Sequence, residues 1–279
     1  MGDLCDHTFP NAPTGARPAA AIFQVLPACG RSRPSWKPVP AQDACHGHAT
    51  ARSGWRGSSP ALFPYCWRTR LALAHKGFVP EALPWRFTDK AAIADSGSDK
   101  VPVLRDGGRV IADSWHIAEY LEDTYPDRPS LFGGPGGRAL ARFVNAWADA
   151  TVLAGLATLI VADIPAILAP EDLAYFIRSR EARFGRPLPE VTADRDERVV
   201  QFRQSLHPAR MILREQPFLH GDAPAYADYI LFGGFQWARC VSSFPILVAD
   251  DPLYAWRERM LDLFGGLARS APPPERCQR

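Results

Sequence analysis

Residues 63–66, Phe-Pro-Tyr-Cys, place a phenol and a thiol at the start of a helical pattern, where both could take part in thiol chemistry. A helix N-terminus carries free N–H groups and a partial positive charge, which stabilise a nearby thiolate. In a Cys-Pro-Tyr-Cys or Ser-Pro-Tyr-Cys turn the reactive group belongs to the first residue, which here is Phe63. Tyr65 remains as a hydroxyl donor, and Ser59 lies upstream as another. Cys66 alone is more typical of a small buried residue.

Two later dipeptides could bind a peptide-like ligand. A proline that starts a buried strand, as in Val101-Pro102, either follows a cis bond, which turns backbone groups outward to pair with an extended peptide, or simply begins the strand. Asp113-Ser114 stands where a helix begins, so the helix N–H groups could bind a carboxylate and Asp113 an ammonium. A plain N-cap is the alternative. As a binding site, the second pair would match an amino-acid head group.

The elements that must position these residues can be predicted from the apolar spacing and the turn residues. The pattern predicts a helix over 65–76, an edge strand over 78–87, a hairpin over 101–113 around Asp-Gly-Gly, and a helix over 114–126. Together they make a small α/β domain over 64–134.

A Gly/Pro-rich segment at 131–137 marks a domain boundary. Residues 138–270 then follow an almost continuous helical pattern, which predicts an all-α domain. The candidate helices are 138–162, 170–184, 194–214, 226–242 and 251–264, and Pro208 is expected to kink the third.

Residues 1–63 differ from the rest of the chain, because they contain no glutamate, one lysine and eight prolines. Such a leader is typical of a disordered or mistranslated segment. Only 21–26 has a strand pattern, and it lies unusually far from the first helix, so we expect the first strand of the α/β domain to be missing or replaced. A frame-shifted start is one hypothesis. The Cys-His-Gly-His run at 45–48 lacks partner ligands, so no metal site is predicted.

The overall composition excludes several classes of protein. Net charge is +2 from 32 basic and 30 acidic residues, which gives no reason to expect nucleic-acid binding. No apolar run reaches the roughly 18 residues that span a bilayer, and the N-terminus has no signal pattern. Six cysteines without paired spacing favour reduced thiols. We therefore expect a cytoplasmic protein that does not bind membranes.

Several segments in order resemble one family. They include PYCWRTRLALAHKGF, KVPVL, DSWHIAEYLEDTYPDRPSLFGG and FLHGDAPAYADYILFGGFQWAR. From about Pro64 to Arg269 the chain resembles the cytosolic glutathione S-transferases, most of all their bacterial β-etherase-like branch. The resemblance implies an α/β thioredoxin-like N-terminal domain plus an all-α C-terminal domain. It also implies glutathione as co-substrate and a homodimer.

The resemblance implies a role for each residue of the binding site. Val101 would pair its backbone with the cysteinyl unit of glutathione, across a cis bond to Pro102. Ser114 would take the γ-glutamyl carboxylate and Asp113 would lie near its amine. Lys100 would meet the glycyl carboxylate.

The resemblance also implies a pocket for a small-molecule electrophile such as an aromatic compound. Its candidate residues are Trp67, Trp147, Trp237 and Arg239, with core packing as the alternative for several of them. Tyr65 or Ser59 would stabilise the glutathione thiolate, which would attack the electrophile, for example an aryl ether. The alternative is a catalytically silent glutathione- or ligand-binding protein, since Phe63 replaces the hydroxyl that β-etherase-like relatives carry at this position.

Overall fold

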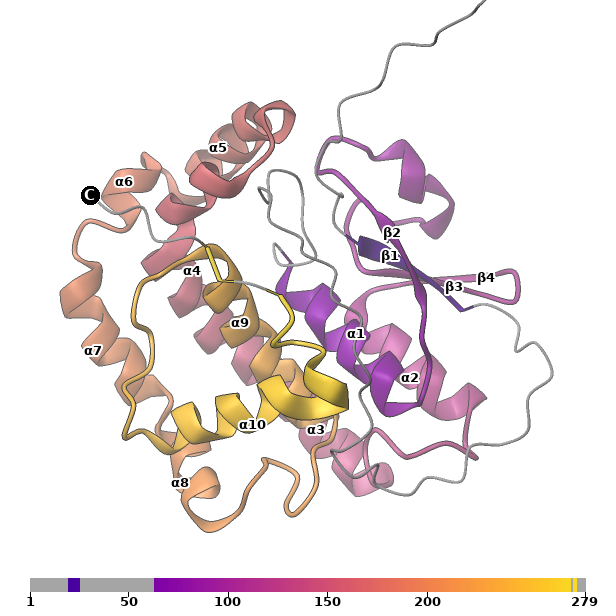
Figure 1. Ribbon diagram of the computed structural model, residues 1–279. Coiled ribbons are helices and arrows are strands. Elements are labelled where there is room, and N and C mark those ends of the chain that lie inside the picture. Colours follow the sequence, from indigo (N-terminus) through magenta and orange to yellow (C-terminus); the bar gives the residue numbers. More distant parts are fainter. Residues whose placement is uncertain (1–19, 26–62, 272, 275–279) are drawn as a thin grey trace, which may run out of the picture.

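The computed structural model describes residues 20–25, 63–271 and 273–274 (Figure 1). Its first domain contains a four-stranded sheet and the helices that cover it. The elements in order are β1 (Ala20–Val25), α1 (Pro64–His75), β2 (Glu81–Pro84), η2 (Ala91–Ser96), β3 (Val103–Asp106), β4 (Arg109–Ala112) and α2 (Ser114–Thr124). The predicted helices and hairpin are therefore confirmed, and the strand predicted over 78–87 is shorter.

The sheet has the order β2-β1-β3-β4 and mixes both directions of pairing. β3 and β4 form the antiparallel hairpin around Gly107 and Gly108, and β2 is an edge strand, as its prolines predicted. β1 occupies a central position, where Phe23 is 1% exposed. The fold expected from the sequence, thioredoxin-like followed by all-α, is the observed one.

The first strand is replaced rather than missing. Residues 20–25 pair with β2 on one side and β3 on the other, which satisfies the backbone groups on both edges. Residues 1–19 and 26–62 of the predicted leader, which include Ser59 and the Cys-His-Gly-His run at 45–48, lie outside the described residues.

The direction of β1 is unusual for a strand that precedes a helix. A helical crossover between neighbouring strands normally leaves them parallel. Here β1 is antiparallel to β2 and parallel to β3, so that Ile22 pairs with Val103 and Val25 with Asp106. The chain therefore leaves β1 at the far end of β3, away from Pro102.

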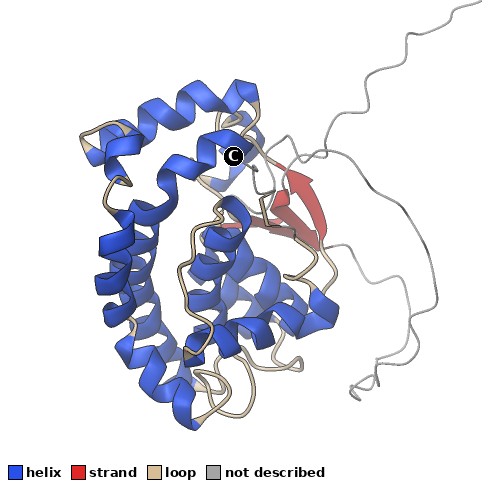
Figure 2. Cartoon of the chain, turned by 60° about the vertical axis from the view of Figure 1, so that its left-hand side comes forward, coloured by secondary structure: helices blue, strands red, loops and turns tan. Residues whose placement is uncertain are grey.

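The second domain is all-α (Figure 2). Its elements are α3 (Pro135–Trp147), η3 (Ala148–Leu153), α4 (Ala154–Ile160), η4 (Val161–Ile167), α5 (Pro170–Phe184), α6 (Leu188–Val191), α7 (Arg195–Ser205), α8 (His207–Glu215), α9 (Tyr226–Val241) and α10 (Pro252–Gly266). The helix predicted over 194–214 is divided into α7 and α8 beside Pro208, which confirms the predicted effect of that proline.

One helical run within the described residues, Pro135–Ile167, is long and apolar enough to cross a membrane, although no such span was expected. Its apolar window is 39% buried in the fold. Gly155 lies against the Phe202 ring of α7, and Leu153 and Leu156 lie against Gly234 of α9. Packing against neighbouring helices thus accounts for part of its apolar character.

Helix α9 is the central helix of the all-α domain, and it also packs against α1 of the first domain. Almost all of its residues are buried. At its start the buried Asp228 carboxylate accepts hydrogen bonds from Leu219 N (2.7 Å), Ala225 N (3.2 Å) and Trp256 Nε1 (2.9 Å). These bonds fix the loop, the helix start and α10 together, although Ala225 has no side-chain acceptor to complete a capping box.

Gly233 allows α9 to pack closely on α1. A Cβ atom at this position would lie 2.6 Å from the Pro64 carbonyl oxygen and 3.0 Å from Arg68 Cγ. The carbonyl belongs to the backbone and cannot turn away as a side chain would, so only glycine fits without moving one of the helices.

Gly233→Ala should lower the free energy of unfolding by about 1–3 kcal/mol, because the added methyl must separate α1 and α9. Urea unfolding followed by circular dichroism measures the change. Gly136→Ala, which meets no atom within 4 Å in α3, is the control and should be neutral or slightly stabilising. Equal midpoints for the two variants would contradict the close approach.

Candidate functional site

The site begins where α1, the start of β3 and the start of α2 meet. The Val101–Pro102 bond is cis, as the resemblance implied. The Pro102 carbonyl oxygen accepts a hydrogen bond from Asp113 N at 3.2 Å. This bond ties the residue that precedes β3 to the residue that precedes α2, so the predicted binding dipeptides are neighbours in space.

Asp113 is the N-cap of α2. Its Oδ1 atom accepts hydrogen bonds from Trp115 N (2.8 Å) and His116 N (3.2 Å), and its φ of 77° lies in the left-handed region. The side chain is 57% exposed, which leaves its second oxygen accessible. The plain N-cap alternative is therefore correct, and it does not prevent Asp113 from also facing a ligand.

Ser114 connects this site to the all-α domain. The residue is 2% exposed, and its carbonyl oxygen accepts a hydrogen bond from the Tyr226 hydroxyl of α9 at 2.5 Å. The first turn of α2 is thus held by a residue at the first position of the central helix.

A pocket of about 260 Å³ lies over these elements. It brings together three of the predicted site residues, Tyr65, Asp113 and Ser114. Six further residues line it, namely Arg68, Trp115, His116, Arg142, Asn145 and Asp149. The pocket therefore combines a phenol, a helix N-terminus, two guanidinium groups and two carboxylates.

Arg68 organises the base of this pocket. It is fully buried and donates from Nε to Ile230 O (3.2 Å), from Nη1 to Asn145 Oδ1 (3.0 Å) and from Nη2 to Asp149 Oδ1 (2.7 Å). Asn145 in turn donates to Asp149 Oδ2 at 3.0 Å. One side chain of α1 is thereby bonded to α9 and to the α3–η3 run.

Tyr65 is the hydroxyl donor closest to the start of α1 that the structure describes. The Arg68 guanidinium lies over its ring at 4.6 Å from the centroid. Burial raises the pKa of Tyr65 and Asp149 adds to the rise, while the charges of Arg68 and Arg183 oppose it. The phenol is therefore protonated at neutral pH and can donate a hydrogen bond to an anion.

Two described cysteines are unsuited to nucleophilic chemistry. Burial raises the pKa of Cys66, which is 1% exposed, far above its ordinary value. Burial also raises the pKa of Cys240 to about 12. Cys66 is thus a core residue, in agreement with the interpretation of the sequence.

Phe63 occupies the N-cap position of α1 and makes no side-chain cap. Its ring contacts Phe87 at 5.1 Å and Trp85 at 5.7 Å between centroids. The position that a hydroxyl would occupy is therefore filled by an aromatic contact with the segment that follows β2.

The remaining predicted residues are dispersed. Trp67 is 1% exposed in the core, which is the packing alternative, and Trp237 is 9% exposed on α9. Arg239 donates to Ala271 O at 2.7 Å, and Trp147 is half-buried at the end of α3. Neither of the two pockets described here is lined by these residues. Lys100 is exposed beside Val101.

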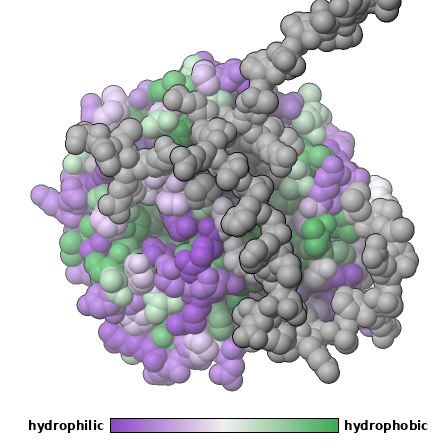
Figure 3. Space-filling model, in the orientation of Figure 1, coloured by the Kyte–Doolittle hydropathy of each residue, from purple (hydrophilic) through white to green (hydrophobic). Residues whose placement is uncertain are grey.

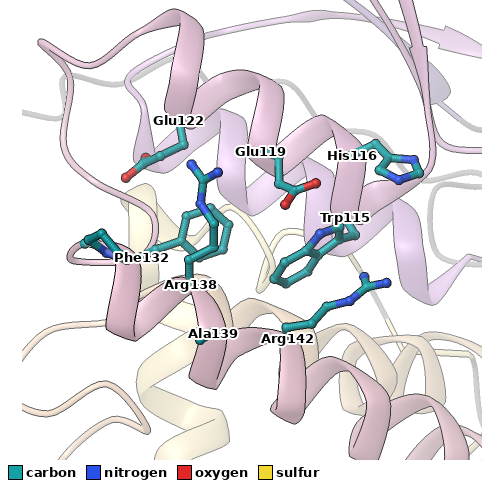
Figure 4. Close-up of a pocket in the computed structure, with 10 residues that line it drawn as sticks. Trp115, His116, Glu119, Glu122, Phe132, Arg138, Ala139 and Arg142 are labelled. Carbon is teal, nitrogen blue, oxygen red and sulfur yellow. The ribbon is translucent and has the colours of Figure 1, made fainter.

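The larger pocket, of about 780 Å³, lies between α2 and α3 (Figure 4). Glu119 and Glu122 reach into it from α2, and Arg138 and Arg142 from α3. The Arg142 guanidinium lies 4.8 Å from the centroid of a Trp115 ring. On the face shown in Figure 3, hydrophobic residues are interspersed with hydrophilic ones.

Metal ligands do not gather in the described part of the chain. No group of three or more His, Cys, Asp or Glu side chains there could hold an ion. The described site offers a phenol, charged side chains and the N-terminus of a helix.

Fold and pocket define a two-domain protein that joins a thioredoxin-like domain to an all-α domain. Residues 64–124 match the family model described as glutathione S-transferase, N-terminal domain, and residues 139–244 match glutathione S-transferase, C-terminal domain. The chain belongs to the glutathione S-transferase family.

Two curated relatives illustrate the similarity. A glutathione S-transferase-like protein of Aspergillus flavus is 32% identical over 139 residues, which cover 45% of this chain and 49% of that protein. A probable glutathione S-transferase of Oryza sativa subsp. japonica is 27% identical over 210 residues, which cover 70% and 79%. The chain spans about half the length of the first relative.

Two solved structures share the fold. A glutathione transferase from Phanerochaete chrysosporium is 24% identical, with a TM-score of 0.61 over 92% of this chain and 95% of that one. A glutathione S-transferase of Ceriporiopsis subvermispora in complex with glutathione is 23% identical, with a TM-score of 0.59 over 90% and 94%.

Arg68→Met should lower the free energy of unfolding by about 2–4 kcal/mol, because it removes the cationic partner of Asp149 and the donor to the Ile230 carbonyl. Chemical denaturation measures the loss. Arg142→Met removes an exposed guanidinium from the same pocket and should cost less than about 1 kcal/mol. A loss from Arg68→Met no larger than that of the control would disprove the role of Arg68 in holding the domains together.

Proposed function

We propose that the protein is a glutathione transferase that activates glutathione as a thiolate for attack on a small electrophile. The observation that carries this proposal is the pocket in which Tyr65, Asp113 and Ser114 meet, beside the cis Val101–Pro102 bond. Family membership and the glutathione-bound relative support glutathione as the co-substrate.

Glutathione would lie along the edge that these residues form. The backbone of Val101, before Pro102, would pair with its cysteinyl unit, and Lys100 would meet its glycyl carboxylate. Ser114 and the start of α2 would take the γ-glutamyl carboxylate, while the second oxygen of Asp113 would face its ammonium. Asp149, also in the pocket, is already paired with Arg68, so Asp113 is the carboxylate available to the ammonium.

The catalytic step needs little from the protein. A free thiol has a pKa of about 8.5, and lowering it by about two units requires roughly 2.7 kcal/mol of preference for the thiolate. The protonated Tyr65 hydroxyl and the N-terminus of α1 would supply it. The thiol proton leaves to solvent, a C–S bond forms, and the leaving group departs with its bonding electrons.

An aromatic electrophile suits the surroundings, because the start of α1 borders the rings of Phe63, Trp85 and Phe87. Because the sequence resembles the β-etherase-like branch, we further propose an aryl ether as the electrophilic substrate. In that reaction the thiolate forms a C–S bond, the C–O bond breaks and the aryloxide takes up a proton. Release of a phenol from a β-aryl ether would demonstrate it.

The expected outcome is that Tyr65→Phe lowers kcat for conjugation at least about tenfold and raises the pH at which bound glutathione becomes a thiolate. Thiolate absorbance and a chromogenic aryl halide measure both. Tyr254→Phe, on α10, is the control.

Other outcomes assign the role differently. If only Ser59→Ala lowers the rate, then Ser59 is the donor. Glutathione binding without conjugation would identify a silent binding protein instead of an enzyme, and the absence of glutathione binding would refute the proposal.

We also propose that the protein is a cytoplasmic homodimer that uses the face formed by α2 and α3. Leu140 is 70% exposed and Phe143 72% exposed on α3, next to the 780 Å³ groove. Exposed apolar side chains beside a groove are typical of an interface between subunits.

Leu140→Glu combined with Phe143→Glu should therefore convert the dimer to a monomer, since two buried charges would oppose association. Light scattering after size-exclusion chromatography gives the mass. Val79→Glu, at a residue 94% exposed after α1, should leave the dimer intact. A monomeric parent protein, or a dimer that survives both substitutions, would contradict the proposed face.

A further inference from the structure

An aromatic cluster connects the start of α1 to helix α5. Phe63 contacts Phe87 at 5.1 Å, and Phe87 contacts Tyr175 at 6.2 Å and Phe176 at 5.8 Å between ring centroids. The Phe87 and Tyr175 rings are nearly parallel, with 29° between their planes. Helix α5 of the all-α domain therefore packs, through Tyr175 and Phe176, against the aromatic residues that border the proposed thiolate site.

A guanidinium group ends this cluster. Arg180 Cζ lies 4.9 Å from the Phe176 ring and 5.7 Å from the Phe87 ring, whereas Phe87 itself touches Phe63. Arg183 follows one turn later. Because residues 176, 180 and 183 are spaced by four and three, they share one face of α5. Only the Phe87 ring thus separates the Arg180 guanidinium from Phe63 at the start of α1.

The two arginines have no carboxylate within ion-pair distance among the residues that the structure describes. Of the neighbouring acids, Glu171 pairs with Arg86 at 3.3 Å, and Glu181 accepts a hydrogen bond from Leu188 N at 3.1 Å. The Arg180 guanidinium does donate to the Ser179 hydroxyl at 3.1 Å, which is a neutral partner. A partly buried cation with only neutral partners favours an anion beside it.

Electrostatics agree with this arrangement. Burial lowers the pKa of Arg180, and the charge of Arg183 lowers it further. The charge of Arg183 also acts on Tyr65, although burial is the larger influence there. The positive field of α5 therefore reaches the residue proposed to stabilise the thiolate.

We propose that the electrophile is an aromatic acid, bound with its ring against the half-buried rings of Phe63 and Tyr175, which Phe87 connects, and its anionic group paired with Arg180 and Arg183. This inference rests on the proposed transferase function and specifies its substrate class. Arg180 is here a specificity residue that binds the substrate's charge at a distance from the reacting carbon.

A matched pair of electrophiles tests the proposal. The probes are a chlorodinitrobenzoate and its neutral methyl ester, each with glutathione. In both reactions the thiolate forms a C–S bond, the C–Cl bond breaks, chloride leaves and the thiol proton goes to solvent. Each enzymatic kcat/KM is divided by the uncatalysed rate, so that intrinsic reactivity cancels. We expect the acid to be favoured over the ester by about tenfold or more, as for a charge-assisted hydrogen bond.

Variants on α5 identify the residue responsible. Arg180→Gln should lower kcat/KM for the acid about 10- to 100-fold and leave that for the ester within about twofold, whereas Arg180→Lys should restore part of the loss. Arg178→Gln removes an equal charge from an exposed position of the same helix and should change neither. An unchanged value for the ester and an unchanged melting temperature show that the cluster has kept its packing.

Several results would overturn the inference. They are equal preference of the parent protein for the two probes, an equal loss for both in Arg180→Gln, or a raised KM for glutathione with either probe, which would place Arg180 at the glutathione carboxylates. Calorimetric titration with the two finished thioether conjugates gives the same comparison without turnover. Binding of glutathione with no preference for the acidic conjugate refutes this inference alone, whereas no binding of glutathione refutes the proposed function and this inference with it.

Discussion

The buried guanidinium of Arg68 joins the two domains. Its guanidinium has partners on α9 and on the α3–η3 run, and its alkyl chain lies beside Gly233, where α1 and α9 approach most closely. A charge removed from water is tolerated only when its donors are satisfied, so α1 must adopt one orientation relative to the all-α domain. That orientation determines where Tyr65, three residues earlier, faces the pocket.

The local elements could be predicted because their signals are local. Helical spacing identified α1 and α2, the Asp-Gly-Gly turn identified the hairpin, and Pro208 identified the break between α7 and α8. The burial of Arg68 could not be predicted in this way. Arg68 lies off the apolar stripe of α1, which suggests a solvent-exposed side chain, but the all-α domain covers that face of the helix as well. Its partners Asn145 and Asp149 are spaced by four on a helix, and this spacing of two polar residues is the sequence feature that could have indicated a buried cation beside them. Trp67 was a candidate for the substrate pocket, with core packing as the alternative, and it lies in the core. The sequence could not decide between the two, because an aromatic residue near an active-site turn is compatible with either.

The start of α1 shows how an aromatic residue changes the nature of a site. Phe63 contributes no hydroxyl, but it joins Trp85 and Phe87 in a largely buried aromatic cluster that extends to α5. Polar contacts are concentrated on the other side of α1, where Tyr65 and Arg68 line the small pocket with Asp113 and Ser114. The two sides of one helix terminus therefore present a polar and an aromatic environment, which suits the proposed reaction between a peptide thiol and an aromatic molecule.

The reversed direction of β1 has a consequence for how this domain could arise in evolution. Parallel and antiparallel ladders both satisfy the backbone groups of a central strand, and Ile22 and Phe23 are buried regardless of chain direction. A segment can thus occupy the central position of the sheet if it has a suitable length and apolar residues. Neither its direction nor its distance from α1 along the chain prevents this. The sheet can therefore accept a different segment as its central strand during evolution without a change in the order of its other strands.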